Sequence, residues 1–172
     1  GYEYELLNHL AQDLGVDLEI VIVKDMNEVI NMLNRGEGDI IAHNLTVTKS
    51  RGELVNFTEP LNRTRQVLVQ RKPDNWKKMS PAALEKKMVR EPADLAGKEV
   101  YVRRKSSYYA RLINLSEEIG QDINIVEVSG EVETEDLIKS VADGKIPYTV
   151  ADENIARLNQ TYYPQLDIAT PV

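Results

Sequence analysis

The chain has 172 residues, enough for one domain or for two small lobes. Its apolar and charged fractions, 42% and 28%, are ordinary for globular proteins and exclude a disordered or fibrous chain. The sequence contains no cysteine, no signal peptide and no apolar run of the ~18–20 residues that a membrane span needs. We therefore expect no disulfide, no thiolate metal site and no transmembrane segment.

The net charge of −7 is unevenly distributed along the chain. The segment from Arg63 to Arg111 carries 14 Lys and Arg against 5 Asp and Glu, whereas the remainder carries 7 against 23. Such a basic segment either steers an anionic partner or forms a solvated face. No nucleic-acid-binding motif accompanies it, so we expect no nucleic-acid partner.

The first 70 residues alternate between helix-like and strand-like patterns. Apolar residues at helical spacing predict helices over residues 4–14 and 25–33. Apolar runs predict three strands, over Leu18–Val23, Asp39–Ala42 and Gln66–Gln70. This alternation is typical of a mostly parallel sheet with helices on its faces.

The composition changes between Arg71 and Ala96, where the apolar stripe becomes thin. Ser80 and Pro81 predict a helix start there, because proline is favoured at the first helical position. We interpret the segment as a connector or insertion beyond a hinge. A second α/β unit follows, with strands predicted over Lys98–Arg103, Ile123–Val128 and Tyr148–Ala151, and helices after Ser107, over Thr134–Ala142 and over Ile155–Tyr162.

Two 20-residue segments of the chain resemble each other. Residues 25–44 read DMNEVINMLNRGEGDIIAHN, and residues 133–152 read ETEDLIKSVADGKIPYTVAD. Gly36 corresponds to Gly144, and Asn44 corresponds to Asp152. The repeat predicts two similar lobes that face each other across a cleft, with Asn44 and Asp152 at matching strand ends.

Polar residues follow the predicted strand Asp39–Ala42 at its carboxyl end, where open α/β sheets bind their ligands. They are Asn44, Thr46, Thr48 and Arg51. Hydroxyls, an amide and a guanidinium fork together suit a carboxylate, because the fork binds two oxygens at once. The alternative is a loop of turn-favouring residues with a solvated arginine.

The stretch GDIIAHNLTVTKSRGELVNFTEP resembles the signature of the family-3 extracytoplasmic solute-binding proteins. The opening GYEYELLNHLAQDLGVDLEI and the late YTVADENIARLNQTYYPQLDIA resemble the N-terminal binding module of the lytic transglycosylase F group. The resemblance implies a two-lobed α/β fold of the type II periplasmic-binding-protein class. We expect lobe one over residues 1–70, a connector over 71–97 and lobe two over 98–172. The family's first strand and final return segment have no counterpart in this sequence.

The resemblance also implies site residues for an α-amino acid. Asn44, Thr46 and Arg51 match the positions that take the carboxylate, and Ser106 and Ser107 match a hydroxyl pair at a helix start. Asp152 matches the residue that receives the ammonium group. Simple helix capping is the alternative for Ser106, Ser107 and Asp152, and the neighbouring Glu153 is an alternative ammonium ligand. Lys105 stands where the family often has glycine.

Nothing in the sequence marks a catalytic centre. His9 and His43 lack a nucleophile or metal-ligand partner at a telling spacing, so we expect no catalytic residue, no metal and no cofactor. The resemblance predicts a non-catalytic sensor or regulatory module of a lytic transglycosylase F-like murein enzyme, binding an amino acid or peptide-like ligand between two lobes.

Two other functions stay open. One is a free-standing amino-acid-binding receptor of an ABC transporter. The other is a glycan- or protein-binding module that uses the basic residues between 63 and 111. The expected location is periplasmic or outer-membrane-associated, with peptidoglycan or a downstream catalytic domain as candidate partners.

Overall fold

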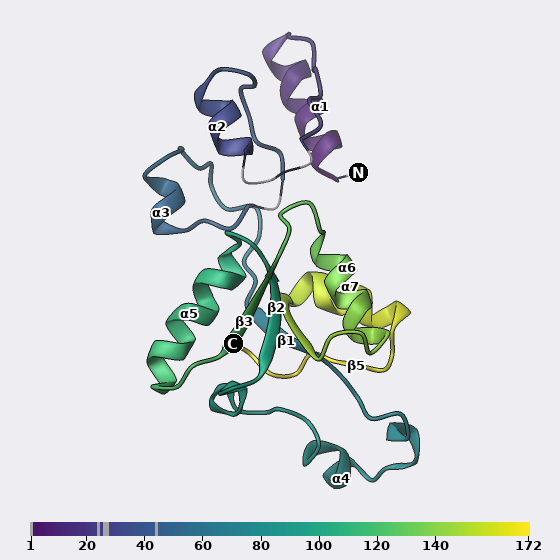
Figure 1. The fold of residues 1–172 in the computed structure, drawn as a ribbon. Coiled ribbons are helices and arrows are strands. Elements are labelled where there is room, and N and C mark those ends of the chain that lie inside the picture. The colour runs from purple at the N-terminus through teal and green to yellow at the C-terminus, as the bar shows by residue number, and fades with distance from the viewer. Residues whose placement is uncertain (1, 24, 26–27, 44) are drawn as a thin grey trace. The chain divides into compact units, whose positions relative to one another are not determined.

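The computed structural model describes residues 2–23, 25, 28–43 and 45–172. The chain forms two compact units, Gly1–Pro60 and Leu61–Val172 (Figure 1). The sequence assigns residues up to 70 to lobe one, whereas strand β1 (Gln66–Arg71) belongs to the sheet of the second unit. A strand joins the sheet that completes its backbone hydrogen bonds, and β1 finds its partners there.

The described residues of the first unit contain helices and connecting segments. The helices are α1 (Tyr2–Leu14), α2 (Val29–Asn34) and α3 (Lys49–Gly52). Helix α1 confirms the helix predicted over residues 4–14, and α2 confirms the one predicted over 25–33 from Val29 onward, with residues 26 and 27 of that prediction outside the described residues. Gly15 and Gly36, which follow them, adopt the left-handed backbone with φ of 67° and 75°, a conformation that ends helices and favours glycine.

The strands predicted over Leu18–Val23 and Asp39–Ala42 are wrong, because neither segment forms a strand in the structure. Ile22 is 84% exposed and Ile40 is 55% exposed, so these apolar runs are not buried as the prediction requires. An apolar run describes side chains only, whereas a strand also needs a neighbouring strand to receive its backbone hydrogen bonds.

The second unit is built on a five-stranded sheet in the order β3-β2-β4-β1-β5. Besides β1, the strands are β2 (Glu99–Arg103), β3 (Asn124–Val128), β4 (Tyr148–Asp152) and β5 (Leu166–Asp167). Strand β2 runs parallel to β3 and β4, and β1 runs antiparallel to β4 and β5. The sheet is therefore mixed, whereas the alternation within the first 70 residues predicts a mostly parallel sheet. Strand β1 is the first strand of this sheet in chain order, so the rule that makes the two strands of a βαβ unit parallel does not fix its direction.

Helices cover both faces of this sheet (Figure 1). Helix α5 (Ser107–Ile119) lies on one face, and α6 (Thr134–Ala142) and α7 (Glu153–Tyr162) lie on the other. Successive side chains of a strand point to opposite faces. Accordingly, Leu68 of β1 packs in the core under α5, while Val67 and Val69 pack in the core under α6 and α7. This explains why β1 reads as a continuous apolar run.

The connector, predicted over residues 71–97, spans residues 72–98 between β1 and β2 and packs against the sheet of the same unit. It contains short helical turns, Trp76–Lys78, α4 (Pro81–Glu85) and Pro92–Leu95, and Ser80 caps α4 by accepting a hydrogen bond from Ala83 N. Val89 and Leu95 are buried in the core with Leu68, although the sequence shows only a thin apolar stripe there.

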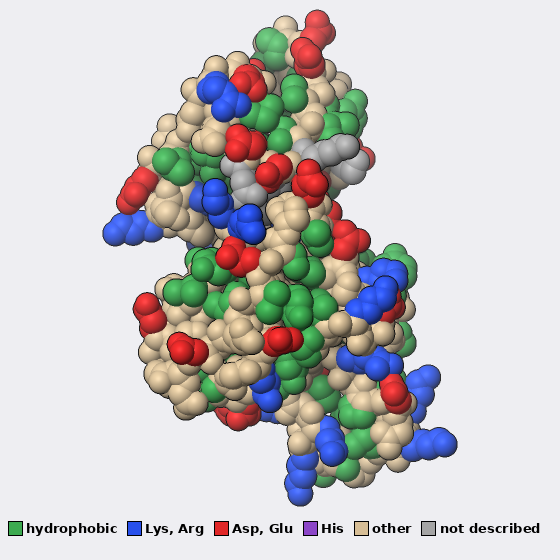
Figure 2. Space-filling model, viewed as in Figure 1, with side chains coloured by type: hydrophobic (Ala, Val, Ile, Leu, Met, Phe, Trp, Pro, Cys, Tyr) green, Lys and Arg blue, Asp and Glu red, His purple; other side chains and the backbone are tan. Residues whose placement is uncertain are grey.

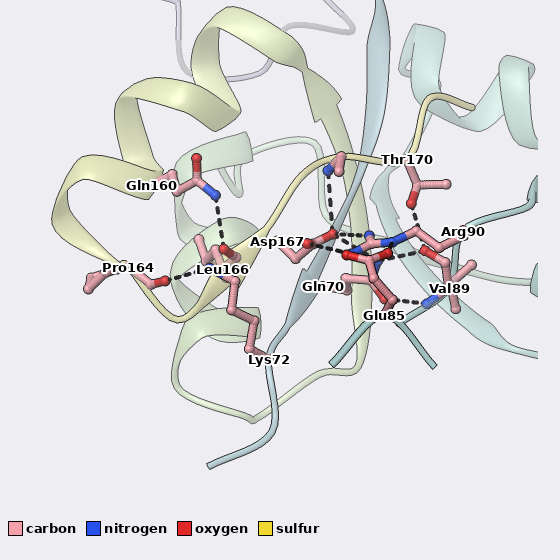
Figure 3. Close-up of polar contacts among 11 residues, drawn as sticks. Gln70, Lys72, Glu85, Val89, Arg90, Gln160, Pro164, Leu166, Asp167 and Thr170 are labelled. Atoms are coloured by element: carbon pink, nitrogen blue, oxygen red, sulfur yellow. Dashed lines mark hydrogen bonds and ion pairs between the residues drawn. The ribbon is translucent and has the colours of Figure 1, made fainter. Parts of the chain in front are cut away.

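Hydrogen bonds tie this connector to the sheet (Figure 3). The buried Gln70 side chain donates to the carbonyl of Val89 and accepts from its N–H, both at 2.9 Å. Thr170 donates to the same carbonyl at 2.6 Å, and Arg90 Nη1 lies 2.6 Å from Asp167 Oδ1. A glutamine amide thus pairs with the backbone at Val89 as a neighbouring strand would.

Truncation of the β1 core tests this packing. Leu68 is fully buried, so Leu68→Ala should lower the free energy of unfolding by about 2–5 kcal/mol through lost burial and the cavity left behind. Urea unfolding followed by circular dichroism measures the change. Leu158→Ala is the control, since that side chain is 61% exposed and its loss should cost less than about 0.5 kcal/mol. Equal effects of the two substitutions would contradict the assigned core.

Candidate functional site

In the first unit, the predicted carboxylate-binding residues lie on a tight loop and the helix that follows it. Arg51 belongs to α3, and its Nη1 donates to the backbone carbonyl of Thr46 at 2.9 Å. Thr48 caps α3 by accepting a hydrogen bond from Arg51 N at 3.3 Å. The loop therefore brings Thr46 and Arg51 together and fixes the guanidinium on it. Asn44, the third predicted residue of this group, lies outside the described residues.

In the second unit, the predicted hydroxyl pair lies at the start of α5. Ser106 is the N-cap of this helix, and its side chain accepts a hydrogen bond from Tyr109 N at 3.2 Å. Ser107, the first helical residue, lies 3.4 Å from Gln66 Nε2 through its hydroxyl oxygen. The capping alternative thus describes Ser106, and Ser107 faces the start of β1.

Asp152 ends β4 and is buried, with 8% of its surface exposed. It stands at the N-cap position of α7, but its side chain makes no capping hydrogen bond. Its carboxyl group instead interacts with the hydroxyl of Tyr108 on α5. Burial raises the pKa of Asp152, and the hydrogen bond with Tyr108 opposes that shift. Burial and the neighbouring Asp152 charge raise the pKa of Tyr108 to about 12, so the tyrosine stays neutral.

The alternative ammonium ligand, Glu153, has a different environment. Its carboxylate binds Arg65 at 2.8 Å and Arg157 at 2.7 Å. Hydrogen bonds from these two arginines lower the pKa of Glu153 to about 2. Within the described part of the chain, Asp152 forms no ion pair. Of the two neighbouring carboxylates, Asp152 is therefore the one that lacks a cation.

Gln66 is a candidate site residue that the sequence did not reveal. It lies directly opposite Asp152 in the β1–β4 pairing, and its amide nitrogen contacts Ser107. Its carbonyl oxygen Oε1 is buried without a hydrogen-bond partner, the single such side-chain atom found among the described residues. A buried acceptor without a donor costs free energy, so Gln66 is a candidate acceptor for a ligand N–H group. Only the strand register reveals it, because Gln66 and Asp152 are far apart in sequence.

Strand direction explains why the residues of the second unit gather. Strands β2 and β4 are parallel, so their carboxyl ends lie at the same edge of the sheet. The β2 end leads to Ser106 and Ser107, and the β4 end carries Asp152. Two groups of polar residues result, one on each unit. We name them the Arg51 group (Thr46, Thr48, Arg51) and the Asp152 group (Gln66, Ser107, Tyr108, Asp152).

No group of three or more His, Cys, Asp or Glu residues in the described part of the chain is placed to hold a metal ion. None of the helices found in the described segments is long and apolar enough to cross a membrane.

Solved structures with the same fold define its class. An ancestral arginine-binding protein bound to arginine superposes with a TM-score of 0.77 at 20% identity, covering 100% of this chain and 69% of that one. The holo form of ArgBP from T. maritima gives 0.76 at 26% identity, covering 100% and 67%. The fold is therefore the two-lobed type II α/β fold of the periplasmic amino-acid-binding proteins.

Sequence comparison gives the family. The family model described as bacterial extracellular solute-binding proteins, family 3, matches residues 1–163. The chain belongs to this family, whose members are binding domains. The predicted family and fold class are thus confirmed.

Curated relatives agree with this assignment. Membrane-bound lytic murein transglycosylase F from Desulfosudis oleivorans is 38% identical over all of this chain and 35% of its own length. The protein of the same name from Saccharophagus degradans is 34% identical, over 98% of this chain and 31% of its own length. The chain thus spans about a third of these relatives and corresponds to a binding module.

The backbone before the hydroxyl pair gives a test of local strain. Lys105 has φ of 55°, in the left-handed region that disfavours residues with a Cβ. This explains why glycine suits the position. We expect Lys105→Gly to raise the free energy of unfolding by up to about 1 kcal/mol, measured by urea unfolding. Lys105→Ala is the control, because it removes the charge and keeps the strain. A gain in both variants would show that charge, not backbone conformation, is responsible.

Proposed function

We propose that this chain is the non-catalytic solute-binding module of a lytic transglycosylase F-like murein enzyme. Its ligand is an amino acid or a peptide-like wall fragment that carries both a carboxylate and an ammonium group. The named relatives and the family support this context. In this proposal the binding of the solute regulates a separate catalytic domain, and the module lies in the periplasm or at the outer membrane.

The proposal rests on one observation: Asp152 is buried and has no cation partner among the described residues. A carboxylate that is buried at a strand end without a cation is destabilised, and such groups cluster at functional sites. A ligand ammonium group supplies the missing charge. Gln66 Oε1 offers a further acceptor beside it.

In this proposal, the Arg51 group supplies the cation that recognises the carboxylate of a zwitterionic ligand. A guanidinium held by a backbone carbonyl is a fixed fork that suits a carboxylate. In the proposal, the ligand carboxylate binds Arg51 and Thr46, with Asn44 as a further donor. Ser106 and Ser107 add donors at the α5 N-terminus, where the helix dipole favours an anion.

A free-standing receptor of an ABC transporter is the alternative within the same binding chemistry. One structural relative is the substrate-binding protein of an amino acid ABC transporter, with a TM-score of 0.76 at 21% identity, which supports a shared fold alone. The relatives of 30–38% identity favour the murein enzyme. A lysozyme-like domain encoded downstream in the same gene would decide between the two.

Thermal shift with amino acids and small muropeptides tests the proposal. A ligand at about a hundred times its dissociation constant adds about 2.7 kcal/mol, which corresponds to an increase in Tm of about 5–10 °C. Arg51→Ala and Asp152→Asn should abolish the increase. Their controls, Lys49→Ala and Glu153→Gln, remove a neighbouring charge and should retain it. A chain that melts cooperatively and responds to none of these compounds would refute the proposal.

The pH dependence of binding and stability provides a second test. An ammonium ligand requires ionised Asp152, so affinity should fall as the pH decreases through the raised pKa of this carboxyl group. The folding stability of the ligand-free chain depends on pH in the opposite direction. A carboxyl group whose pKa is higher in the folded state stabilises it below the unfolded pKa and loses this contribution as the pH rises through the folded value.

Asp152→Asn should therefore make the ligand-free protein more stable at neutral pH, while abolishing binding. Urea unfolding at pH 7 and pH 4, with and without ligand, measures both effects. A loss of stability at pH 7 in the ligand-free variant would show that ionised Asp152 stabilises the fold, which contradicts its proposed role as a ligand-binding group.

A further inference from the structure

A polar cavity lies in the Leu61–Val172 unit, apart from the Asp152 group. Its volume is about 460 Å³, and it lies between the start of the connector, the end of α4 and the turn that precedes β4. The charged residues that line it are Arg71, Lys72, Asp74, Lys87 and Lys145. We call it the basic cavity, because four of these five side chains are cationic.

The strand register separates the basic cavity from the Asp152 group. Gln66 pairs with Asp152 at one end of the β1–β4 ladder, and Gln70 pairs with Tyr148 at the other. Gln70 and Tyr148 line the basic cavity. Four residue steps along a strand cover roughly 13 Å, so the two sites lie at opposite edges of the sheet.

The cationic side chains that line the cavity differ in their contacts with other protein groups. Lys72 lies 4.5 Å from the centre of the Trp76 ring and donates to the carbonyl of Pro164. Lys145 lies 3.4 Å from Asp143, which also binds Lys139 more closely at 2.7 Å. Figure 2 shows Lys and Arg side chains gathered at the end of this unit that carries α4.

Lys87 is the cation with the fewest protein partners. In the described part of the chain it takes part in no ion pair, and its side chain is exposed. A cavity whose charged lining is four cations to one carboxylate attracts anions, although the chain as a whole has a net charge of −7.

Arg71 is the group best suited to bind an anion in the basic cavity. Its Nη2 lies 2.6 Å from Asp74 Oδ1, three residues along the chain. The Asp74 side chain is 83% exposed, and such exposed ion pairs contribute little free energy. An incoming carboxylate or phosphate can therefore replace Asp74 on the guanidinium.

The backbone at Gly144 allows the guanidinium to sit in the cavity wall. A Cβ at this position would lie 3.3 Å from Arg71 Nη1, and Gly144 has φ of +73°. Both the close approach and the backbone conformation favour glycine here. The same glycine ends α6, so a single residue shapes the turn and leaves room for Arg71.

We propose that the basic cavity is a binding site for a small oxyanion that carries carboxylate or phosphate groups. Arg71 binds the anion through its guanidinium fork, Lys87 and Lys145 add charge, and Asp74 occupies Arg71 until the anion displaces it. The site is independent of the proposed solute-binding function, because it uses other residues at the opposite edge of the sheet.

Isothermal titration with inorganic phosphate and with citrate tests this proposal. The protein is the whole chain carrying Arg51→Ala, which removes the carboxylate ligand of the other site. Low ionic strength is needed, since salt near 0.15 M screens exposed charges beyond about 8 Å. Binding of phosphate alone would assign the site to phosphate groups, and binding of citrate alone would assign it to carboxylates.

Two pairs of variants, each with a matched control, distinguish binding at a defined site from general electrostatic attraction to a basic surface. Lys87→Ala should weaken binding by up to about fivefold, whereas Lys86→Ala, next to it and outside the cavity lining, should leave it unchanged. Asp74→Asn should tighten binding by a similar factor, because the internal competitor is lost. Asp94→Asn, which changes the charge equally at an exposed position outside the cavity, should have no effect.

The proposal fails if neither phosphate nor citrate binds to the Arg51→Ala chain. It also fails if Lys86→Ala weakens binding as much as Lys87→Ala, or if Asp94→Asn tightens it as much as Asp74→Asn. Those results would show attraction to a basic surface without a defined site. The thermal-shift response to amino acids is expected to be the same in Lys87→Ala and in the unmodified chain, so failure of one site leaves the other unaffected.

Discussion

The pairing of β1 with β4 is the constraint on which the second unit depends. Five residue pairs, from Gln66 opposite Asp152 to Gln70 opposite Tyr148, align the two strands in antiparallel register. A shift by one residue would turn every side chain of β1 to the other face. Leu68 would then leave the core under α5, and Val67 and Val69 would leave the core under α6 and α7.

The same register positions both candidate sites. At one end it brings the unsatisfied carbonyl oxygen of Gln66 next to the buried carboxyl group of Asp152. At the other end, Gln70 directs its side chain to Val89, which holds the connector against the sheet. The connector in turn supplies Lys87 to the basic cavity. Two separate polar sites thus depend on one strand pair.

Asp152 and Glu153, two adjacent carboxylates at the end of β4, have different surroundings. Glu153 forms ion pairs with Arg65, which lies in the segment that leads into β1, and with Arg157, one turn further along α7. Asp152 is buried against Tyr108 and lacks a cation among the described residues. The pKa of Glu153 is lowered by its two arginine partners, whereas burial raises the pKa of Asp152. The two adjacent carboxyl groups thus differ in charge environment because of the residues around them.

Local features of the sequence were sufficient to predict much of this unit and part of the other. Helices α1 and α6, the caps at Ser80 and Ser106, and the left-handed turns at Gly36 and Gly144 follow from residue types within a few positions of one another. The end of β4 at Asp152 could be predicted in the same way, and the family could be recognised from its motifs.

Contacts between residues that are distant in the chain could be identified only from the tertiary structure. The apolar runs over 18–23 and 39–42 resembled strands but form none, because strand formation depends on a neighbour that periodicity does not encode. Gln66 and the basic cavity were missed for the same reason, since register brings together residues more than 70 positions apart. The sequence by itself determined helices, caps, turns and family membership. Only the tertiary structure decided strand pairing, the role of Gln66 and the position of the cavity, because these depend on contacts between segments that no local pattern specifies.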